Sequence, residues 1–158
     1  MREIPLTQGY VAIVDEADYE WLSQWKWQYY QGYARRTSDH KGSKTYMHNA
    51  ILGVPEGLQA DHINFNTLDN RRTNLRIVTP AENSQHRRPS ILNTSGFKGV
   101  TWHKGVGKWQ AFVRTLGENY YLGLFHNRED AARAYDEAAR RLFGEYAYLN
   151  YPEKGEAK

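Results

Sequence analysis

The sequence predicts an α+β protein, and three patterns support this prediction. Short strand-like runs fill the amino-terminal half of the chain, and two of them, residues 59–62 and 74–79, precede a capped helix start. Three more runs, separated by turns that contain glycine, follow further along. Residues 128–143 then form one amphipathic helix with a face of small residues. We therefore expect a β-rich amino-terminal segment, a ββα core, and a three-stranded antiparallel sheet packed on one α-helix.

The amino-terminal segment reads as a strand followed by a helix. Residues 10–14 have strand character, and Asp15 can cap the helix that follows. On that helix Trp21 and Trp25 are four residues apart and share a face. We expect both tryptophans to be core anchors.

A hairpin should come next. Residues 27–30 and 33–36 flank Gln31-Gly32, and residues 45–51 predict a further strand after the polar turn 39–42. Four basic side chains of this region fit either phosphate contact or a solvated edge: Arg35, Arg36, Lys41 and Lys44.

A linker separates the two halves. Thr79-Pro80-Ala81-Glu82 is typical of a helix start, and that helix should reach about Arg88. Residues 89–96 are polar, broken by proline and closed by glycine, which favours a boundary there. The sequence thus predicts domains at residues 1–88 and 97–152.

Composition restricts the classes of function. The 158 residues can form one domain or two small ones, and the lack of cysteine excludes disulfides, thiolate zinc sites and thiol nucleophiles. No run approaches the roughly 18 apolar residues of a membrane span, and residues 1–5 lack the apolar core of a secretory signal. We expect a soluble, non-exported protein with no membrane partner and no obligate protein partner.

The charge is uneven along the chain. Residues 35–128 contain 14 Lys and Arg but 6 Asp and Glu, a net charge of +8, within a total of +3. Such a basic middle fits a protein that neutralises phosphates, although solvated basic faces are as common.

Asp61-His62, Asn74 and Asn83 carry the chemistry. Hydrolysis of a phosphodiester needs an activated water and a cation that neutralises the phosphoryl oxygens. Asp61 and Asn83 offer hard oxygen ligands, which suit Mg²⁺ or Mn²⁺, and a neutral His62 could take the proton of the attacking water. A regular strand would point Asp61 and His62 to opposite faces, so the strand must end or twist there. The polar loop 63–73 should need side-chain hydrogen bonds to hold its shape.

Several ordered stretches surround these residues: Met47-His48, Ile51-Leu52, Asp61-His62-Ile63, Leu68-Asp69-Asn70-Arg71-Arg72, Asn74-Leu75-Arg76-Ile77-Val78-Thr79 and Glu82-Asn83. Residues 47–88 thereby resemble the HNH endonuclease family, with its ββα-metal fold, in the version found in phage and intron-encoded homing endonucleases. The ββα-metal core would occupy about residues 59–88. The resemblance implies a phosphodiester hydrolase that acts on double-stranded DNA in the cytoplasm of a bacterial or phage-infected cell.

The resemblance also implies roles for individual residues. His62 would be the general base, Asp61 and Asn83 would hold one divalent cation, Mg²⁺ or Mn²⁺, and Asn74 would orient His62 or fix the loop. Asn83 stands where the family name expects histidine, with His86 as the alternative ligand. Three arginines near the site would contact DNA: Arg71, Arg72 and Arg76. One site per chain favours nicking.

The carboxy-terminal stretches resemble the DNA-binding domain of plant ethylene-response factors, the APETALA family. They are Phe97-Lys98-Gly99-Val100, Gly107-Lys108-Trp109, residues 121–125, 129–136 and 147–151. A twisted three-stranded sheet can lie in the major groove and present alternate side chains to base edges. Its reading face would consist of Lys98, Thr101, His103, Arg114 and Tyr121, with Lys108 and Trp109 near the DNA backbone.

Two other functions are compatible with these features. A sequence-specific DNA-binding regulator with a catalytically inactive nuclease core is the leading rival. An RNA- or protein-binding scaffold ranks lower, because it would leave the metal-site residues without a purpose.

Overall fold

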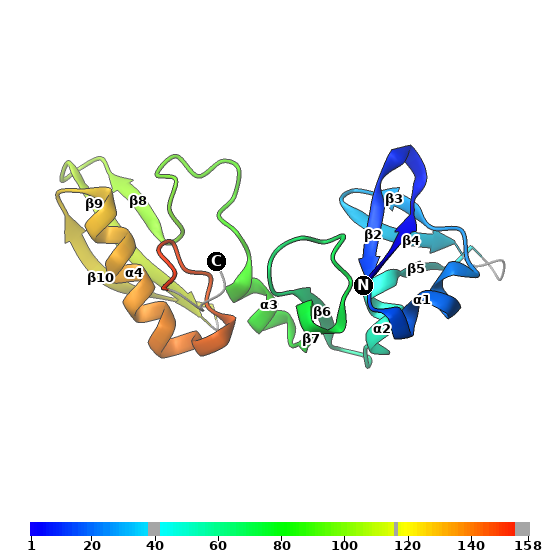
Figure 1. Ribbon diagram of the computed structural model, residues 1–158. Coiled ribbons are helices and arrows are strands. Elements are labelled where there is room, and N and C mark those ends of the chain that lie inside the picture. Colours follow the sequence, from blue (N-terminus) through cyan, green and yellow to red (C-terminus); the bar gives the residue numbers. More distant parts are fainter. Residues whose placement is uncertain (38–41, 116, 154–158) are drawn as a thin grey trace. The chain divides into compact units, whose positions relative to one another are not determined.

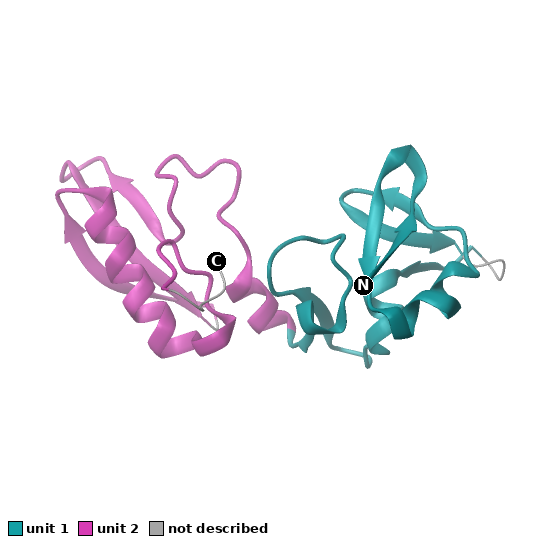
Figure 2. Cartoon of the chain, viewed as in Figure 1, with its two compact units in different colours: residues 1–79 teal, residues 80–158 magenta. Residues whose placement is uncertain are grey.

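The computed structural model describes residues 1–37, 42–115 and 117–153 (Figure 1). The chain divides into two compact units, residues 1–79 and 80–158, and each unit is described by itself (Figure 2). Lys41 and most of the predicted turn at residues 39–42 lie outside the described residues. The mixture of helices and antiparallel sheets confirms the predicted α+β class. None of the described helices has the length and apolar character needed to cross a membrane.

The first unit contains three small antiparallel sheets: β1 with β2, the order β3-β4-β5, and β6 with β7. Two short 3₁₀ turns, Thr7–Gly9 and Arg72–Asn74, join some of its elements. The elements in chain order are β1 (Arg2–Pro5), β2 (Val11–Val14), α1 (Glu16–Ser23), β3 (Gln28–Tyr30), β4 (Tyr33–Thr37), β5 (Lys44–Tyr46), α2 (Met47–Leu52), β6 (Gln59–His62) and β7 (Leu75–Val78).

The predicted hairpin is confirmed as β3 and β4. Its two central residues, Gln31 and Gly32, have φ of 49° and 92°. Positive φ at both positions matches the twist of the flanking strands in a two-residue hairpin. The chain reversal therefore depends on a glycine at position 32, where positive φ costs no side-chain clash.

The predicted strand at residues 45–51 is wrong beyond Tyr46, because helix α2 begins at Met47. Met47 and Ile51, four residues apart, are both buried, as is His48. Gly53 ends the helix in the left-handed conformation, with φ of 59°. The helical spacing of the buried residues outweighed the strand character of the run.

The prediction that Trp21 and Trp25 anchor the core is also wrong, since their side chains are 36% and 44% exposed. Helix α1 instead buries the face that carries Asp18 and Leu22. The core tryptophan is Trp27, which is 3% exposed and donates from Nε1 to the Leu22 carbonyl at 2.9 Å. The prediction placed the face of Trp21 and Trp25 in the core, but the face that carries Asp18 and Leu22 packs inward.

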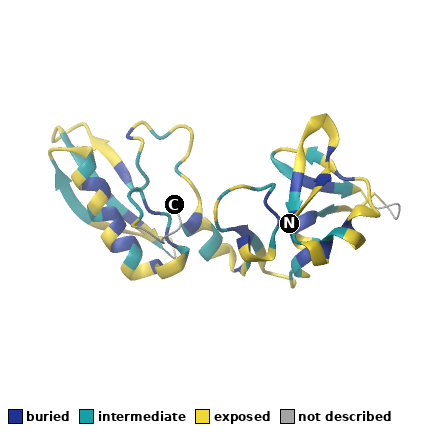
Figure 3. Cartoon of the chain, in the orientation of Figure 1, coloured by how far each residue is buried: buried dark blue, intermediate teal, exposed yellow. Residues whose placement is uncertain are grey.

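The second unit begins with α3, and its antiparallel sheet covered by one helix is as predicted. Its sheet has the antiparallel order β10-β9-β8, and one side of α4 is buried against it (Figure 3). The small residues Ala131, Ala132, Ala138 and Ala139 let α4 lie close to the sheet. The elements are α3 (Pro80–His86), β8 (Val100–His103), β9 (Lys108–Thr115), β10 (Glu118–Phe125), α4 (Arg128–Phe143) and a 3₁₀ turn (Gly144–Tyr146).

A buried carboxylate fastens the end of the second unit to its start. Asp136, on α4, accepts hydrogen bonds from the backbone N–H of Asn150 at 2.8 Å and of Tyr151 at 2.7 Å. The Asn150 amide oxygen in turn accepts from the Lys98 N–H at 2.8 Å. The chain after α4 is therefore held across the beginning of the sheet.

The predicted linker, residues 89–96, contains a turn that side-chain hydrogen bonds hold in shape. The Asn93 amide oxygen accepts hydrogen bonds from the N–H groups of Ser95 and Gly96, each at 2.9 Å, and Ser95 is buried. The compact units meet at Thr79 and Pro80, so α3 belongs to the second unit. The predicted domains at residues 1–88 and 97–152 stay a prediction.

Gly99 offers a test of the second unit. Its φ is +72°, and a Cβ there would lie 2.0 Å from Tyr135 Cδ2 and 2.6 Å from the Phe112 carbonyl oxygen. Gly99→Ala should lower the free energy of unfolding by about 3 kcal/mol or more, because a clash adds to left-handed strain. Gly107→Ala is the control, with φ of +66° and open space around its Cβ. Equal losses in urea unfolding would contradict the packing at Gly99.

Candidate active site and nucleic-acid interface

The Asp61-His62 pair closes strand β6, so the requirement that the strand end at this dipeptide is met. In the β6–β7 register Asp61 lies opposite Arg76 and His62 opposite Leu75. Asp61 Oδ2 accepts from Arg76 Nε at 2.9 Å, and the Arg76 Nη2 atom lies 2.8 Å from the same oxygen. Both side chains are largely buried. Arg76, predicted to contact DNA, therefore also fixes the orientation of the Asp61 carboxylate.

His62 lies in a buried cluster of aromatic and imidazole rings. Its ring centroid is 5.0 Å from that of His48 and 6.2 Å from that of Tyr33. Its Nε2 lies 3.4 Å from Asn70 Oδ1. Burial lowers the pKa of His62, and the hydrogen bond to Asn70 and the charge of Asp61 offset this in part. The imidazole is consequently neutral near pH 7, which is the form a general base requires.

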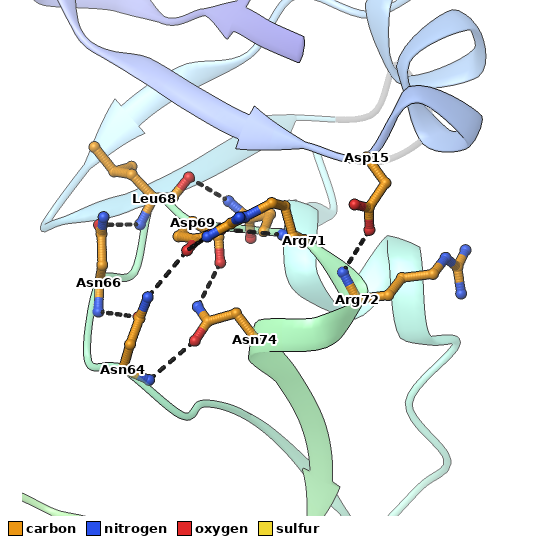
Figure 4. Close-up of polar contacts among 9 residues, drawn as sticks. Asp15, Asn64, Asn66, Leu68, Asp69, Arg71, Arg72 and Asn74 are labelled. Atoms are coloured by element: carbon orange, nitrogen blue, oxygen red, sulfur yellow. Dashed lines mark hydrogen bonds and ion pairs between the residues drawn. The ribbon is translucent and has the colours of Figure 1, made fainter. Parts of the chain in front are cut away.

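The Asn74 amide organises the loop between β6 and β7 (Figure 4). Its Nδ2 donates to the Asp69 carbonyl at 2.7 Å, and its Oδ1 accepts from the Asn64 N–H at 2.9 Å. The Asn64 side chain donates to Asp69 Oδ2 at 3.0 Å and accepts from the Asn66 N–H at 2.8 Å. These bonds confirm that side chains hold the loop in shape. Asn74 was predicted either to orient His62 or to fix the loop, and these hydrogen bonds correspond to the second role.

Two more arginines predicted to contact DNA bind carboxylates in the first unit. Arg71 donates to Asp69 from Nε at 2.7 Å and from Nη2 at 2.6 Å. Arg72 donates to Asp18 through the same two atoms, each at 2.8 Å. Bidentate pairing of this kind lowers the pKa of both carboxyl groups. Contact of Arg71, Arg72 and Arg76 with DNA stays a prediction, but each already has an anionic partner.

The predicted metal ligands lie in different units, Asp61 on β6 and Asn83 on α3. Across the described residues, no group of three or more His, Cys, Asp and Glu side chains could hold a metal ion by itself. The oxygen donors of Asp61 and Asn83 suit a hard divalent cation, with water and phosphate filling its remaining positions. The donor chemistry thus fits Mg²⁺ or Mn²⁺ in kind. His86, the alternative ligand, is buried on α3.

The second unit presents one face of its sheet away from α4. Val100 and Ala111 pair across β8 and β9 and are buried on the helix side. Side chains alternate along each strand, so the neighbouring positions point to the opposite face. That face carries most of the predicted reading residues, which are exposed or half-buried: Thr101, His103, Lys108, Arg114 and Tyr121.

Lys98 and Trp109 have other surroundings. The Lys98 ammonium donates to the carbonyl of Arg87 at 2.7 Å and to that of Gln85, at the end of α3. Burial, reinforced by the charge of Arg87, lowers the pKa of Lys98 to about 8. Trp109 packs with the core cluster on the helix side and meets Trp102 edge to face at 5.0 Å. DNA contact by Lys98 and Trp109 stays a prediction. The contacts described here join each side chain to other parts of the second unit.

Sequence reasoning missed several residues that the fold brings to these sites. Tyr33 and Asn70 contact His62, although Tyr33 precedes it by 29 positions. Nothing local in the sequence indicates the Tyr33 contact, whereas Asn70 belongs to a stretch already recognised. Gln110 and Phe112 share the outer face of the second sheet with Thr101. Alternation along β9 could have identified both.

Comparisons with known proteins give two kinds of relative. A family model described as HNH endonuclease matches residues 49–85. Protein 3.8 of Escherichia phage T7 is 34% identical over 94 residues, 60% of this chain and 77% of the phage protein. An uncharacterized HNH endonuclease of Acanthamoeba polyphaga mimivirus is 28% identical over 149 residues, 90% of this chain and 76% of its own. APETALA2-like protein 2 of Oryza sativa subsp. japonica is 41% identical over 120 residues, 71% of this chain and 27% of the plant protein.

His48 should make stability depend on pH. Burial, followed by the charge of His62, lowers the pKa of His48 to about 4 from 6.5. The unfolded chain therefore binds a proton more readily, so the stabilising contribution is complete above pH 6.5 and is lost as the pH falls towards 4.

Between pH 7 and pH 5 this loss should be about 2 kcal/mol, at roughly 1.4 kcal/mol per pKa unit. His48→Phe should remove it, and urea unfolding at the two pH values measures the difference. His126→Phe, at an exposed position, is the control. An equal loss in wild type and His48→Phe would count against the buried neutral imidazole.

Proposed function

Because the chain belongs to the HNH endonuclease family and joins that core to an AP2-like DNA-binding unit, we propose that it is a metal-dependent DNA endonuclease that hydrolyses phosphodiester bonds. The observation that carries the proposal is the environment of His62. Its imidazole is buried, is neutral near pH 7 and lies at the end of a strand beside Asp61. A base in that state can accept a proton from water at physiological pH.

Asn70 favours one tautomer of His62. The Asn70 Nδ2 group donates to the Leu68 carbonyl at 3.2 Å, which orients its Oδ1 towards His62 Nε2. Since Oδ1 only accepts hydrogen bonds, Nε2 carries the proton and Nδ1 carries the lone pair. In the proposed reaction His62 Nδ1 accepts the proton of the attacking water. Cleavage leaves a 5′-phosphate and a 3′-hydroxyl.

Asp61 and Asn83 are the proposed ligands of one Mg²⁺ or Mn²⁺ ion. When bound, the cation neutralises negative charge on the phosphoryl oxygens and on the departing 3′ oxygen. The Arg76 guanidinium holds the Asp61 carboxylate in one orientation. One active site in each chain favours a nick in one strand of double-stranded DNA. Enzymes of the homing type would use such a cut at a preferred site.

The outer face of the second sheet is the proposed reader of the DNA. A twisted sheet fits the major groove and presents alternate side chains to base edges. Arg114 and Tyr121 on this face are exposed, and His103 lies opposite Lys108 across the strands. The unit would place the nuclease core on its target.

One observation favours the second candidate, a DNA-binding regulator with an inactive core. Asp61 Oδ2, one of the two carboxylate oxygens available to a cation, already accepts a hydrogen bond from Arg76 Nε and lies 2.8 Å from Arg76 Nη2. If that ion pair persists on DNA, the metal site stays incomplete and the protein binds without cutting.

A cleavage assay distinguishes the two candidates. Supercoiled plasmid that carries a verified binding site is incubated with the protein and Mg²⁺ or Mn²⁺. His62→Ala should lower the nicking rate by about 10²- to 10⁴-fold, because it removes the general base. The exposed His126→Ala variant should nick like wild type. Equally intact plasmid with wild type and His62→Ala would remove the enzyme proposal and leave the regulator.

A binding assay tests the reader face. Lys108→Ala or Arg114→Ala should weaken binding to a target duplex by roughly tenfold, since one lost contact to DNA costs about 1–3 kcal/mol. Fluorescence anisotropy with EDTA present measures binding without cleavage. Arg141→Ala removes the same charge from an exposed position on α4, which covers the other side of the sheet. A comparable loss in Arg141→Ala would point to a general charge effect.

A further inference from the structure

Arg35, on β4, is a buried arginine with no anionic partner among the described residues. Arg35 is only 9% exposed, and its guanidinium stays protonated, as guanidinium groups do in proteins. In the described part of the chain its one partner is the Tyr30 ring, whose centroid lies 3.6 Å from Cζ. Its Nε atom has no hydrogen-bond partner there. A buried charge is costly unless an opposite charge or hydrogen bonds compensate it.

The neighbours of Arg35 lead to His62. Arg35 lies opposite Tyr46 across β4 and β5, and side chains opposite one another share a face of the sheet. The Tyr46 ring stacks on His48, with centroids 5.5 Å apart and planes 13° apart. The edge of His48 meets His62 at 5.0 Å. Continuous ring contacts therefore connect the strand neighbour of Arg35 with the proposed general base.

Tyr33 adds a second connection. It is two residues before Arg35 on the same strand and therefore on the same face. Its ring contacts both His48, at 5.6 Å, and His62, at 6.2 Å. One face of the β3-β4-β5 sheet thus brings Arg35 and the histidine pair into the same part of the first unit.

We propose that Arg35 binds a DNA phosphate at the nuclease site, through the guanidinium that has no carboxylate partner among the described residues. The ligand class is a phosphodiester, which a planar guanidinium can bind through two parallel hydrogen bonds. Arg71, Arg72 and Arg76 each have a carboxylate partner, whereas Arg35 has none in the described part of the chain. Arg35 also precedes residues 49–85, which the family model matches. The inference rests on the proposed function, because it adds a phosphate contact to that site.

Arg36 is a matched control on the next position. Its Cζ lies 3.9 Å over the Trp25 ring, and its Nε likewise has no hydrogen-bond partner among the described residues. It points to the opposite face of β4, together with the core residue Ala34. Arg35 and Arg36 therefore share a charge and a cation–π contact but not the side that carries the histidines.

The first experiment measures single-turnover nicking by the full chain. Arg35→Met, Arg35→Lys and Arg36→Met are compared with wild type at saturating DNA, after thermal unfolding has shown that each variant is folded. Arg35→Met should lower the rate at least tenfold with less than a threefold change in DNA affinity. Arg35→Lys should recover part of the rate, and Arg36→Met should stay within threefold of wild type. Equal rates for folded Arg35→Met and Arg36→Met would overturn the proposal.

The second experiment needs no cleavage. Inorganic phosphate should raise the Tm of wild type and of Arg36→Met above that in sodium chloride of equal ionic strength, because it binds the folded state. Arg35→Met should lose this extra shift. The same shift in Arg35→Met as in wild type would refute the phosphate site, even if the protein does not nick DNA. Conversely, a shift that depends on Arg35 without nicking would separate the anion site from the failure of the proposed function.

Discussion

The hydrogen bonds of the Asn74 amide are the constraint on which the site in the first unit depends. Asn74, at the end of the β6–β7 loop, bonds Asn64 near the start of the loop and Asp69 in its middle, and so closes the loop upon itself. The closed loop then pairs with β2, where the Ile13 N–H donates to the Leu68 carbonyl at 2.8 Å and the Asn70 N–H donates back at 2.7 Å. Asn70 is thereby held where its side chain meets His62. A single amide thus couples the loop, the neighbouring sheet and the proposed base.

Charge in the first unit is arranged around the same loop. Arg72 joins the loop end to Asp18 on α1, Arg71 returns to Asp69 within the loop, and Arg76 meets Asp61 across the strands. Each pair places a charged acceptor opposite a planar donor, so the carboxylates are held without free rotation. Within the described residues Arg35 departs from this pattern, since it is buried against an aromatic ring instead. No carboxylate pairs with its guanidinium among the residues that the structure describes.

Local signals predicted much of the fold. The hairpin at Gln31-Gly32, the β6 and β7 strands, helix α3 and the sheet with its covering helix follow from turn residues, alternation and capping. Errors arose where two periodicities compete. Met47 and Ile51 have strand-like neighbours but are buried at helical spacing. On α1 the face that carries Leu22 is buried, whereas Trp21 is exposed. Which side of a short helix turns inward depends on the surrounding core, which one segment of sequence does not specify.

The candidate site was predicted in composition and less well in contacts. Asp61, His62 and Asn74 lie where their spacing placed them, in and around one pair of strands. The partners Arg76, Asn70 and Tyr33 are selected by register and by packing over long sequence separations. Lys98 illustrates the same limit, because its motif position indicates a surface strand while its ammonium binds two carbonyls. The sequence predicted the kinds of side chain at the candidate site, but only the folded structure identifies the partner that each side chain contacts.

The two carbonyls that Lys98 binds lie in the last turn of α3 and one residue beyond it, and this bears on how such chains can recombine. A gene fusion that replaced everything after residue 88 with an unrelated reader would leave α3 without the ammonium that satisfies its last carbonyls. A junction between Thr79 and Pro80 would instead transfer α3 together with its cap. Part of the segment that the HNH endonuclease model matches therefore belongs to the same compact unit as the AP2-like sheet.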